Sequence, residues 1–388
     1  MVTKTVIVVG GVRNLSGAGG PPVPDVQQPS RIDGQKIPNP PAGAAAINVP
    51  LLCVILTGVL VVSVLLAIGL GAAAVSPGET LRYLWAALTG GRITADEVTA
   101  YQIIWQVRTP RVLLAVLVGA GLSAVGVAIQ AMVRNALADP FVLGVSSGAS
   151  AGAVLVSVFG AMAAMGIYAV SVGAFLGALL VSTLVYLASR NSGGLSPLRL
   201  VLTGVAMAFG FQAVMSVIVY FAPDGEATSM ILFWSMGGFG AASWGALPVV
   251  AVVTIVSIVL LHRHGRMLDV LALGDETSAS LGVDSVRLRR RLFVLTSLAT
   301  GAMVAVSGAI GFVGLVMPHL VRLWVGAAHV RVLAIAPLVG AIFMVWADLV
   351  ARTLVAPREL PIGAITALVG VPVFVILLRR RGYLFGGR

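Results

Sequence analysis

Long stretches of this chain carry no charged residue, and this feature limits the fold more than any other. Residues 141–189 contain no charge at all. The apolar runs are continuous rather than alternating, and about 20 apolar residues are enough to cross a bilayer as a helix. Only 10% of the residues are charged and 59% are hydrophobic, whereas a soluble globular chain is about 25% charged. Because only helices and closed barrels satisfy backbone hydrogen bonds in lipid, we predict an all-α polytopic membrane protein.

The apolar runs divide into about ten expected spans. Residues 141–189 are long enough for two of them, with a turn near residues 160–166. The others are expected at 51–75, 112–133, 200–221, 245–261, 292–310, 312–325, 332–350 and 361–378. The run at 312–325 fits least well, because Pro318, His319 and Arg322 interrupt it. A short helix is expected at 229–237, between the fifth and sixth spans.

A faint internal repeat divides these spans into two halves. Gly119 and Ala120, followed by Gly126, match Gly301 and Ala302, followed by Gly308 at the same spacing. The first copy is expected to run from outside to inside and the second from inside to outside. This pattern predicts two five-helix halves of inverted topology, a common plan of transporters. Chance similarity in a chain with 46 glycines is the alternative.

Residues 1–49 are rich in proline and glycine, which predicts a flexible tail before a transmembrane domain at 50–388. Beyond the tail, arginines are concentrated in the gaps that an even number of spans places on the side of the tail. Positive charge marks the cytoplasmic side, so both termini are expected in the cytoplasm. The net charge of +11 does not indicate nucleic acid, because the arginines lie in these short gaps.

Charged residues within or beside a span are the first candidates for a functional site, because charge is costly in a bilayer. Asp348 lies deepest, and Arg352 follows it by one helical turn, so the two can neutralise each other. The pair is either a structural ion pair or part of a transport route. Arg108 and Arg111 flank Pro110 at the outer end of the second span, where a helix is expected to begin. They can dock an acidic partner, attract an anionic substrate or reach lipid headgroups.

The inner loop at residues 262–291 contains a second candidate site. Gly274 and Gly282 bracket about two turns of expected helix, whose N-terminus favours acidic residues through the helix dipole. Such a short helix below the membrane fits a groove on a cytoplasmic motor, although a solvated connector has the same pattern. The candidate coupling residues are Gly274, Asp275, Glu276, Thr277, Leu281, Gly282 and Val283.

Other kinds of site find little support in the sequence. Neither lysine belongs to a phosphate-binding G-x-x-x-x-G-K-[ST] sequence, so this chain is not expected to be an enzyme, and ATP hydrolysis is expected from a separate chain. The histidines lack metal-ligand spacing within a span, and Cys53 is the only cysteine. No metal, cofactor or nucleic-acid partner is expected.

Four motifs follow one another along residues 50–380. They comprise 108–114 with Gln130, 134–140 and 143–149; 274–283; 311–319 with Arg322; and 359–363 with Thr366, Gly370 and Pro372. Together they resemble the FecCD-type permeases, the membrane subunits of ABC importers for ferric siderophores, haem and cobalamin. The chain departs from the family pattern at Thr109, where leucine is common, and at Ala136, where proline is common and a softer turn is expected.

The resemblance implies ten spans and a second permease subunit, either a copy of this chain or a paralogue. It implies two cytoplasmic ATP-binding subunits and an extracytoplasmic substrate-binding protein. It also implies that the chain lies in the membrane lipid of the inner or plasma membrane of a bacterium. Arg108 and Arg111 would dock that binding protein, with Arg352 as a weaker third, and Gly274 to Val283 would couple to the ATPase.

The expected function is therefore a transmembrane permease subunit of an ATP-driven importer for ferric siderophores. A permease for haem or cobalamin is the nearer alternative. The more distant alternative is a secondary transporter driven by protons or sodium, for which Asp348 is the one in-span carboxylate at hand.

Overall fold

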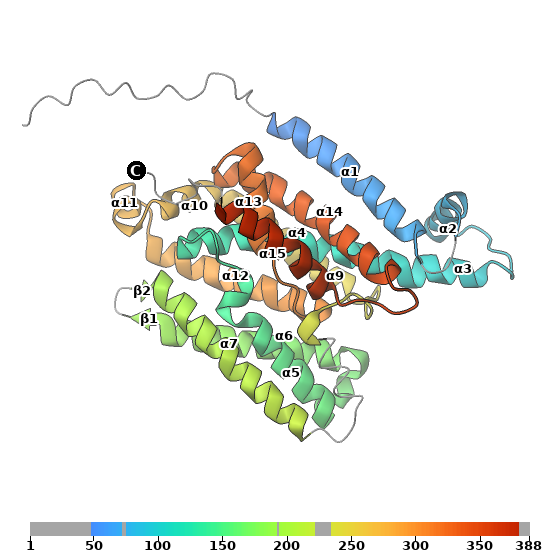
Figure 1. The fold of residues 1–388 in the computed structure, drawn as a ribbon, viewed down its shortest axis with the longest axis horizontal. Coiled ribbons are helices and arrows are strands. Elements are labelled where there is room, and N and C mark those ends of the chain that lie inside the picture. The colour runs from blue at the N-terminus through green and yellow to red at the C-terminus, as the bar shows by residue number, and fades with distance from the viewer. Residues whose placement is uncertain (1–47, 72–74, 192–193, 222–233, 380–388) are drawn as a thin grey trace, which may run out of the picture. The chain divides into compact units, whose positions relative to one another are not determined.

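The computed structural model describes residues 48–71, 75–191, 194–221 and 234–379, and helices dominate this part of the chain (Figure 1). The tail predicted at 1–49 lies outside the described residues apart from its last two positions, so it stays a prediction. The first part of the helix expected at 229–237 also lies outside them, and residues 234–236 are helical. The predicted all-α class is confirmed for the described residues.

In the described part of the chain, the longer helices are joined by two short 3-10 helices, η2 and η3, and one π-helix, η1. In chain order, the elements are α1 (Val49–Gly69), α2 (Pro77–Thr89), α3 (Val98–Gln102), η1 (Ile103–Arg108), α4 (Thr109–Val133), η2 (Pro140–Leu143), α5 (Val145–Phe159), η3 (Ala163–Tyr168), α6 (Ala169–Ser189), β1 (Arg190–Asn191), β2 (Gly194–Leu195), α7 (Pro197–Tyr220), α9 (Leu247–Arg263), α10 (Gly265–Ala272), α11 (Asp275–Ser280), α12 (Ser285–Ser307), α13 (Val313–Val325), α14 (His329–Thr353) and α15 (Ile362–Arg379). The two strands pair antiparallel and were not expected from the sequence.

Among the described residues, 6 helices are long and apolar enough to cross a membrane, and the pair α9 and α10, bent by 60°, makes a seventh. Three further apolar helices, α5, α13 and α15, are shorter. Taken in chain order, these elements correspond one to one with the ten expected spans. The run that proline and arginine interrupt is helical as α13, with Pro318 inside it.

The second span begins much earlier than the sequence indicates. The span was expected to start at residue 112, with Pro110 near the beginning of the helix. Helical backbone is instead continuous over Val98–Val133. The π-helix η1 precedes α4 directly, and the Thr109 hydroxyl donates to the carbonyl of Ile104 at 2.7 Å. Proline lacks an N–H group, so a wider helical turn before Pro110 lets the chain continue without a break.

Helix α4 is the most buried of the spans and packs against α9, α12, α13 and α14. Glycines make this close packing possible. A Cβ atom added to Gly119 would lie 2.4 Å from the carbonyl oxygen of Gly340 on α14, and one added to Gly126 would lie 1.9 Å from that of Gly314 on α13. Any side chain at these positions would separate the helices. The backbones therefore approach as small residues allow in membrane helix bundles.

The helix contacts agree with two related halves. Helix α4 packs on α13 and α14, and α12, its expected counterpart, packs on α5 and α6. Gly119 faces α14, while a Cβ on Gly301 would lie 3.3 Å from Ala178 on α6, the counterpart of α14. The second pair of repeat glycines is not equivalent. Gly126 lies within α4 and packs against α13, whereas Gly308 follows the last residue of α12 and has a φ of 64°.

Candidate functional site

Three arginines and two carboxylates meet near the start of α4. Arg111 Nε donates to Asp348 Oδ1 at 2.8 Å, and Arg111 Nη1 donates to Glu359 Oε1 at 2.7 Å. Asp348 is fully buried and also lies 3.3 Å from Arg352 Nε, one turn later on α14. The i+4 pairing expected from the sequence is therefore present, but within a larger network. With Arg108, these residues are called the arginine network below.

The arginine network also holds the C-terminal end of α1. Arg108 Nη1 donates to the carbonyl oxygens of Gly69 at 2.7 Å and Ile68 at 3.2 Å. Arg352 Nη1 donates to the carbonyl oxygen of Leu70 at 2.8 Å. The last carbonyls of a helix have no partner within the helix, and they carry its partial negative charge. These guanidinium groups therefore cap α1 and compensate its dipole.

All three arginines predicted to dock a partner are buried, with exposed fractions of 5% for Arg108, 7% for Arg111 and 8% for Arg352. Each is engaged by carboxylates or carbonyls of its own chain. The side chain of Glu359, by contrast, is 50% exposed. Docking by these arginines stays a prediction. Any account of docking has to include the carboxylates and carbonyls of this chain that already bind the three arginines.

The predicted coupling residues lie where the sequence places them, on a short helix after α10. Helix α11 begins at Asp275 and is bracketed by Gly274 and Gly282, both with positive φ. The buried side chain of Ser278 holds α11 in place. Its hydroxyl donates to the carbonyl of Gly274 at 2.6 Å and lies 3.0 Å from the carbonyl of Val270. Positive φ favours glycine, so the backbone conformation explains why glycine occupies both positions.

The two acidic residues of α11 have different surroundings. Asp275 accepts a hydrogen bond from Arg289 Nη2 at 2.7 Å, whereas Glu276 is exposed. Burial alone would raise the pKa of Asp275, but Arg289, together with Arg134, outweighs burial and lowers the pKa. Asp275 is therefore ionised at neutral pH. It attaches α11 to the transmembrane helices, and Glu276 is left facing solvent.

Arg289 is a site residue that the sequence analysis did not single out. It is 2% exposed and bonds to three separate elements: Asp275 on α11, the carbonyl of Met132 on α4 at 3.3 Å and the carbonyl of Leu195 on β2 at 3.1 Å. In the sequence it is hidden in the arginine-rich start of α12, where neighbouring arginines are exposed. The spacing of Arg289 could have revealed it, because Arg289 lies on the same buried face of α12 as Leu288 and Leu292.

Two large apolar side chains flank α11 and remain exposed. Leu273 is 64% exposed and Leu281 is 59% exposed. Both lie next to α11 in the segment that joins α10 to α12. Exposed apolar residues beside an acidic helix end are typical of a protein contact surface. Thr277 and Gly282 are exposed as well, and Val283 is half-buried.

A third polar contact lies within the helix bundle. Arg322 on α13 donates to the amide oxygen of Gln130 on α4. The Gln130 amide nitrogen in turn donates to the carbonyls of Gly314 at 3.3 Å and Leu315 at 3.2 Å. Charge-assisted hydrogen bonds of this kind make a buried guanidinium tolerable. Gln130 and Arg322, both part of the motifs above, thus hold α4 and α13 together.

A cavity of about 520 Å³ lies between α5 and α7, and its lining combines apolar side chains with uncharged polar ones. Its polar side chains are Ser146, Ser147, Ser150, Gln212 and Ser235. They come from two helices and the segment before α9, so the cavity collects hydroxyl and amide groups from separate parts of the chain. Hydroxyls and amides both donate and accept hydrogen bonds, which suits a ligand with many oxygen atoms.

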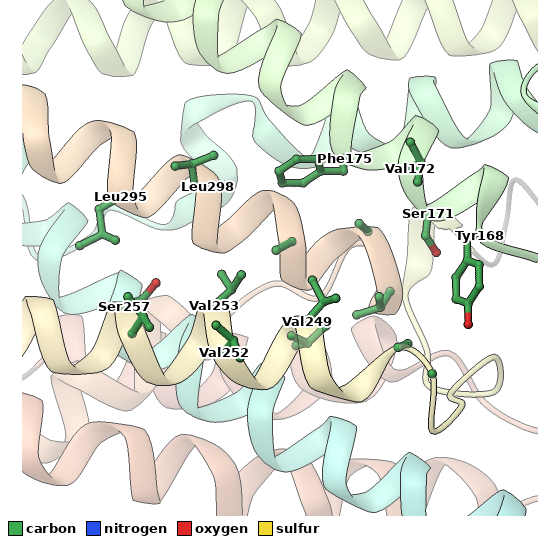
Figure 2. A pocket seen from close by; sticks show the side chains of 17 residues that line it. Tyr168, Ser171, Val172, Phe175, Val249, Val252, Val253, Ser257, Leu295 and Leu298 are labelled. Carbon is green, nitrogen blue, oxygen red and sulfur yellow. The ribbon is translucent and has the colours of Figure 1, made fainter. Parts of the chain in front are cut away.

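A second cavity, of about 560 Å³, lies between α6, α9 and α12 and is lined almost only by apolar side chains (Figure 2). Figure 2 shows Phe175 of α6 across from Val252 and Val253 of α9, with Leu295 and Leu298 of α12 beside them. Several lining residues are also exposed, including Val249 and Val252. This cavity offers few polar partners, so it is a poorer candidate for a polar substrate than the one between α5 and α7.

Known proteins share this arrangement of motifs over most of the chain. The model of the FecCD transport family matches residues 59–380. The chain belongs to the FecCD transport family. It is 40% identical over 328 residues to the hemin transport system permease protein HmuU of Yersinia pestis, covering 83% of this chain and 94% of HmuU. It is 39% identical over 281 residues to the vitamin B12 import system permease protein BtuC of Vibrio cholerae, covering 72% of this chain and 83% of BtuC.

A solved structure agrees with the sequence relatives. It is described as an inward-facing conformation of a metal-chelate type ABC transporter, is 34% identical, matches with a TM-score of 0.74 and covers 85% of this chain and 99% of its own. The FecCD chain described here is therefore an ABC importer permease, a multi-pass membrane protein and a transport subunit rather than an enzyme on its own. Permeases of this family work with ATPase subunits and a second permease subunit.

Proposed function

We propose that this FecCD permease carries ferric siderophores. The observation that supports this substrate class is the cavity between α5 and α7, whose described lining holds serine and glutamine side chains among apolar ones and no charged side chain. A ferric hydroxamate siderophore such as ferrichrome presents many oxygen atoms and no net charge, and hydroxyl and amide groups can hold it weakly. Haem would bring two carboxylates to a lining whose described residues include no cation. Haem and vitamin B12 nevertheless remain the alternatives, because HmuU and BtuC are named for them.

The substrate is tested by uptake into proteoliposomes that hold this permease with the ATPase encoded in the same genome. Ferrichrome, haemin and cyanocobalamin are offered separately, each with the substrate-binding proteins of that genome. The proposal expects ATP-dependent accumulation of ferrichrome above that of the other two. Uptake of haemin or cyanocobalamin alone would assign the chain to the alternative. Replacing Gln212 by Leu should reduce uptake of the favoured chelate without preventing assembly.

The ATPase contact is proposed to be α11 and the residues that flank it. Glu276, Thr277 and Leu281 are exposed there, and Leu273 adds a large apolar side chain. Through Asp275 and Arg289, movement of α11 reaches α4 and the strand β2 directly. This linkage supports a coupling role over a solvated connector. The cytoplasmic placement of α11, and of both termini, follows from the arginine bias of the sequence.

The arginine network is proposed to dock an extracytoplasmic substrate-binding protein. Because Arg111 also holds the buried Asp348, the matched test replaces both charges together, as R111Q/D348N. Docking of the binding protein to the permease in nanodiscs should weaken, most clearly at low salt. R82Q, at an exposed arginine that pairs with Glu97, is the control. Equal loss of docking in both variants, or in neither, would remove the assignment.

A secondary transporter driven by protons is a poorer fit to the geometry. Such a transporter needs a carboxylate that exchanges protons with solvent during the cycle. Asp348 is fully buried and lies between Arg111 and Arg352, which both pair with it, so solvent does not reach its carboxylate. It therefore acts in this arrangement as the anchor of the arginine network rather than as a proton carrier.

A further inference from the structure

Glu359 differs from the other members of the arginine network in its access to solvent. Its side chain is 50% exposed, whereas that of Arg111 is 8% exposed and that of Asp348 is fully buried. Arg111 thus has one carboxylate that is locked in the interior and one that reaches it from the surface. Only the second can be exchanged without opening the helix bundle.

The backbone on either side of Glu359 is held in place. The amide of Arg358 donates to the carbonyl of Val355 at 3.1 Å, and the amide of Leu360 donates to the carbonyl of Ala351 at 2.9 Å. Glu359 can therefore leave Arg111 by rotating its side chain, with no rearrangement of the loop. Rotation of an exposed side chain is fast, and an incoming carboxylate would replace the ion pair that the rotation breaks.

The charges of the network favour an incoming carboxylate. Arg111 pairs with both Asp348 and Glu359, Arg352 pairs with Asp348, and α1 contributes carbonyl oxygens rather than a formal charge. When Glu359 turns away, the guanidinium of Arg111 keeps one carboxylate and has a surface position for a second. An arginine fork is well matched to carboxylate oxygens.

We propose that Glu359 occupies, on Arg111, the position that a carboxylate of the extracytoplasmic binding protein takes when it docks. Docking then exchanges one carboxylate for another. In the free permease Glu359 shields Arg111, and it competes with the partner for the same guanidinium. The inference rests on the proposed docking role of the arginine network, and it adds the residue that the docking partner displaces.

The test removes the charge of Glu359 and measures docking. Permease carrying E359Q, in nanodiscs, is titrated with each substrate-binding protein encoded in the same genome. Loss of the competitor should tighten docking of the cognate protein by about threefold to tenfold at low salt, and less at high salt. E97Q is the matched control, since Glu97 is also paired with an arginine, Arg82, outside the network. It should leave docking unchanged.

The R111Q/D348N background separates this inference from the docking proposal. If docking needs the network and Glu359 competes for Arg111, E359Q has no further effect in that background. If R111Q/D348N loses docking but E359Q alone leaves it unchanged or weaker, the exchange is wrong and the docking site stands. If no binding protein docks, or R111Q/D348N docks as well as R82Q, the docking site fails and the exchange with it.

Discussion

At the scale of single residues, the buried charges of this permease are held mainly by contacts that are distant in sequence. Asp348 is the most constrained of them, because two guanidinium groups lie against it and solvent does not reach it. Taking charges into the interior is costly, and the cost is recovered only while the buried partners stay in place. The network is therefore sensitive to loss of Asp348, whereas Glu359 at the surface is less constrained.

The variant D348N should be much less stable than the native protein. It leaves Arg111 and Arg352 buried with insufficient negative charge, and removing one partner of a buried ion pair costs about 3–5 kcal/mol. Unfolding by denaturant in mixed micelles measures the change. E97Q, at an exposed pair, should have a far smaller effect. Similar midpoints for the two variants would contradict a structural role for Asp348.

The two acidic residues of α11 should respond differently to substitution. D275N removes the contact with Arg289 and should raise amide hydrogen exchange over residues 275–280 by about tenfold or more. E276A leaves that exchange unchanged, because Glu276 is exposed and only its contact with the ATPase is expected to be lost. ATP-coupled uptake should fall severalfold in both. Equal exchange in the two variants would contradict the separation of anchoring from partner contact.

At the scale of elements, α4 organises the bundle through its glycines. Its neighbours approach so closely that a methyl group at Gly126 would overlap the backbone of α13. In lipid, where the hydrophobic effect does not drive helices together, close backbone packing is a main source of stability. The position of α4 therefore depends on small residues as much as on apolar ones.

G126A should destabilise the bundle by about 1–3 kcal/mol, because α4 and α13 must separate to admit the methyl group. G58A is the matched control on α1, where a Cβ atom meets nothing within 4 Å. Alanine is the better helix former, so G58A should be neutral or slightly stabilising. Thermal unfolding in nanodiscs compares the two. A similar loss of stability in both would show that the packing at Gly126 is not limiting.

The elements themselves were largely predictable from the sequence, whereas their long-range contacts were not. Continuous apolar runs located the spans, and helical spacing alone placed Asp348 beside Arg352. The partner Glu359 was not foreseen, because it lies 248 residues from Arg111. Arg289 was hidden among exposed arginines, and the extension of the second span through Pro110 needed a π-helix that no local pattern indicates. Tertiary packing decides each of these features.

At the scale of the whole molecule, two charged sites lie at different ends of the helix bundle. The arginine network joins α1, α4 and α14, and Arg289 joins α11, α12 and α4. Helix α4 takes part in both, so it connects the proposed docking site with the proposed ATPase contact. Coupling between such sites requires an element that both can move, and α4 satisfies that condition.

The source of energy is the most direct test of this account. Proteoliposomes containing the permease, its ATPase and a binding protein loaded with radiolabelled ferrichrome are followed with and without internal ATP. The account predicts accumulation that requires both ATP and the ATPase and that persists when a protonophore collapses the proton gradient. Accumulation without the ATPase that the protonophore abolishes would contradict it.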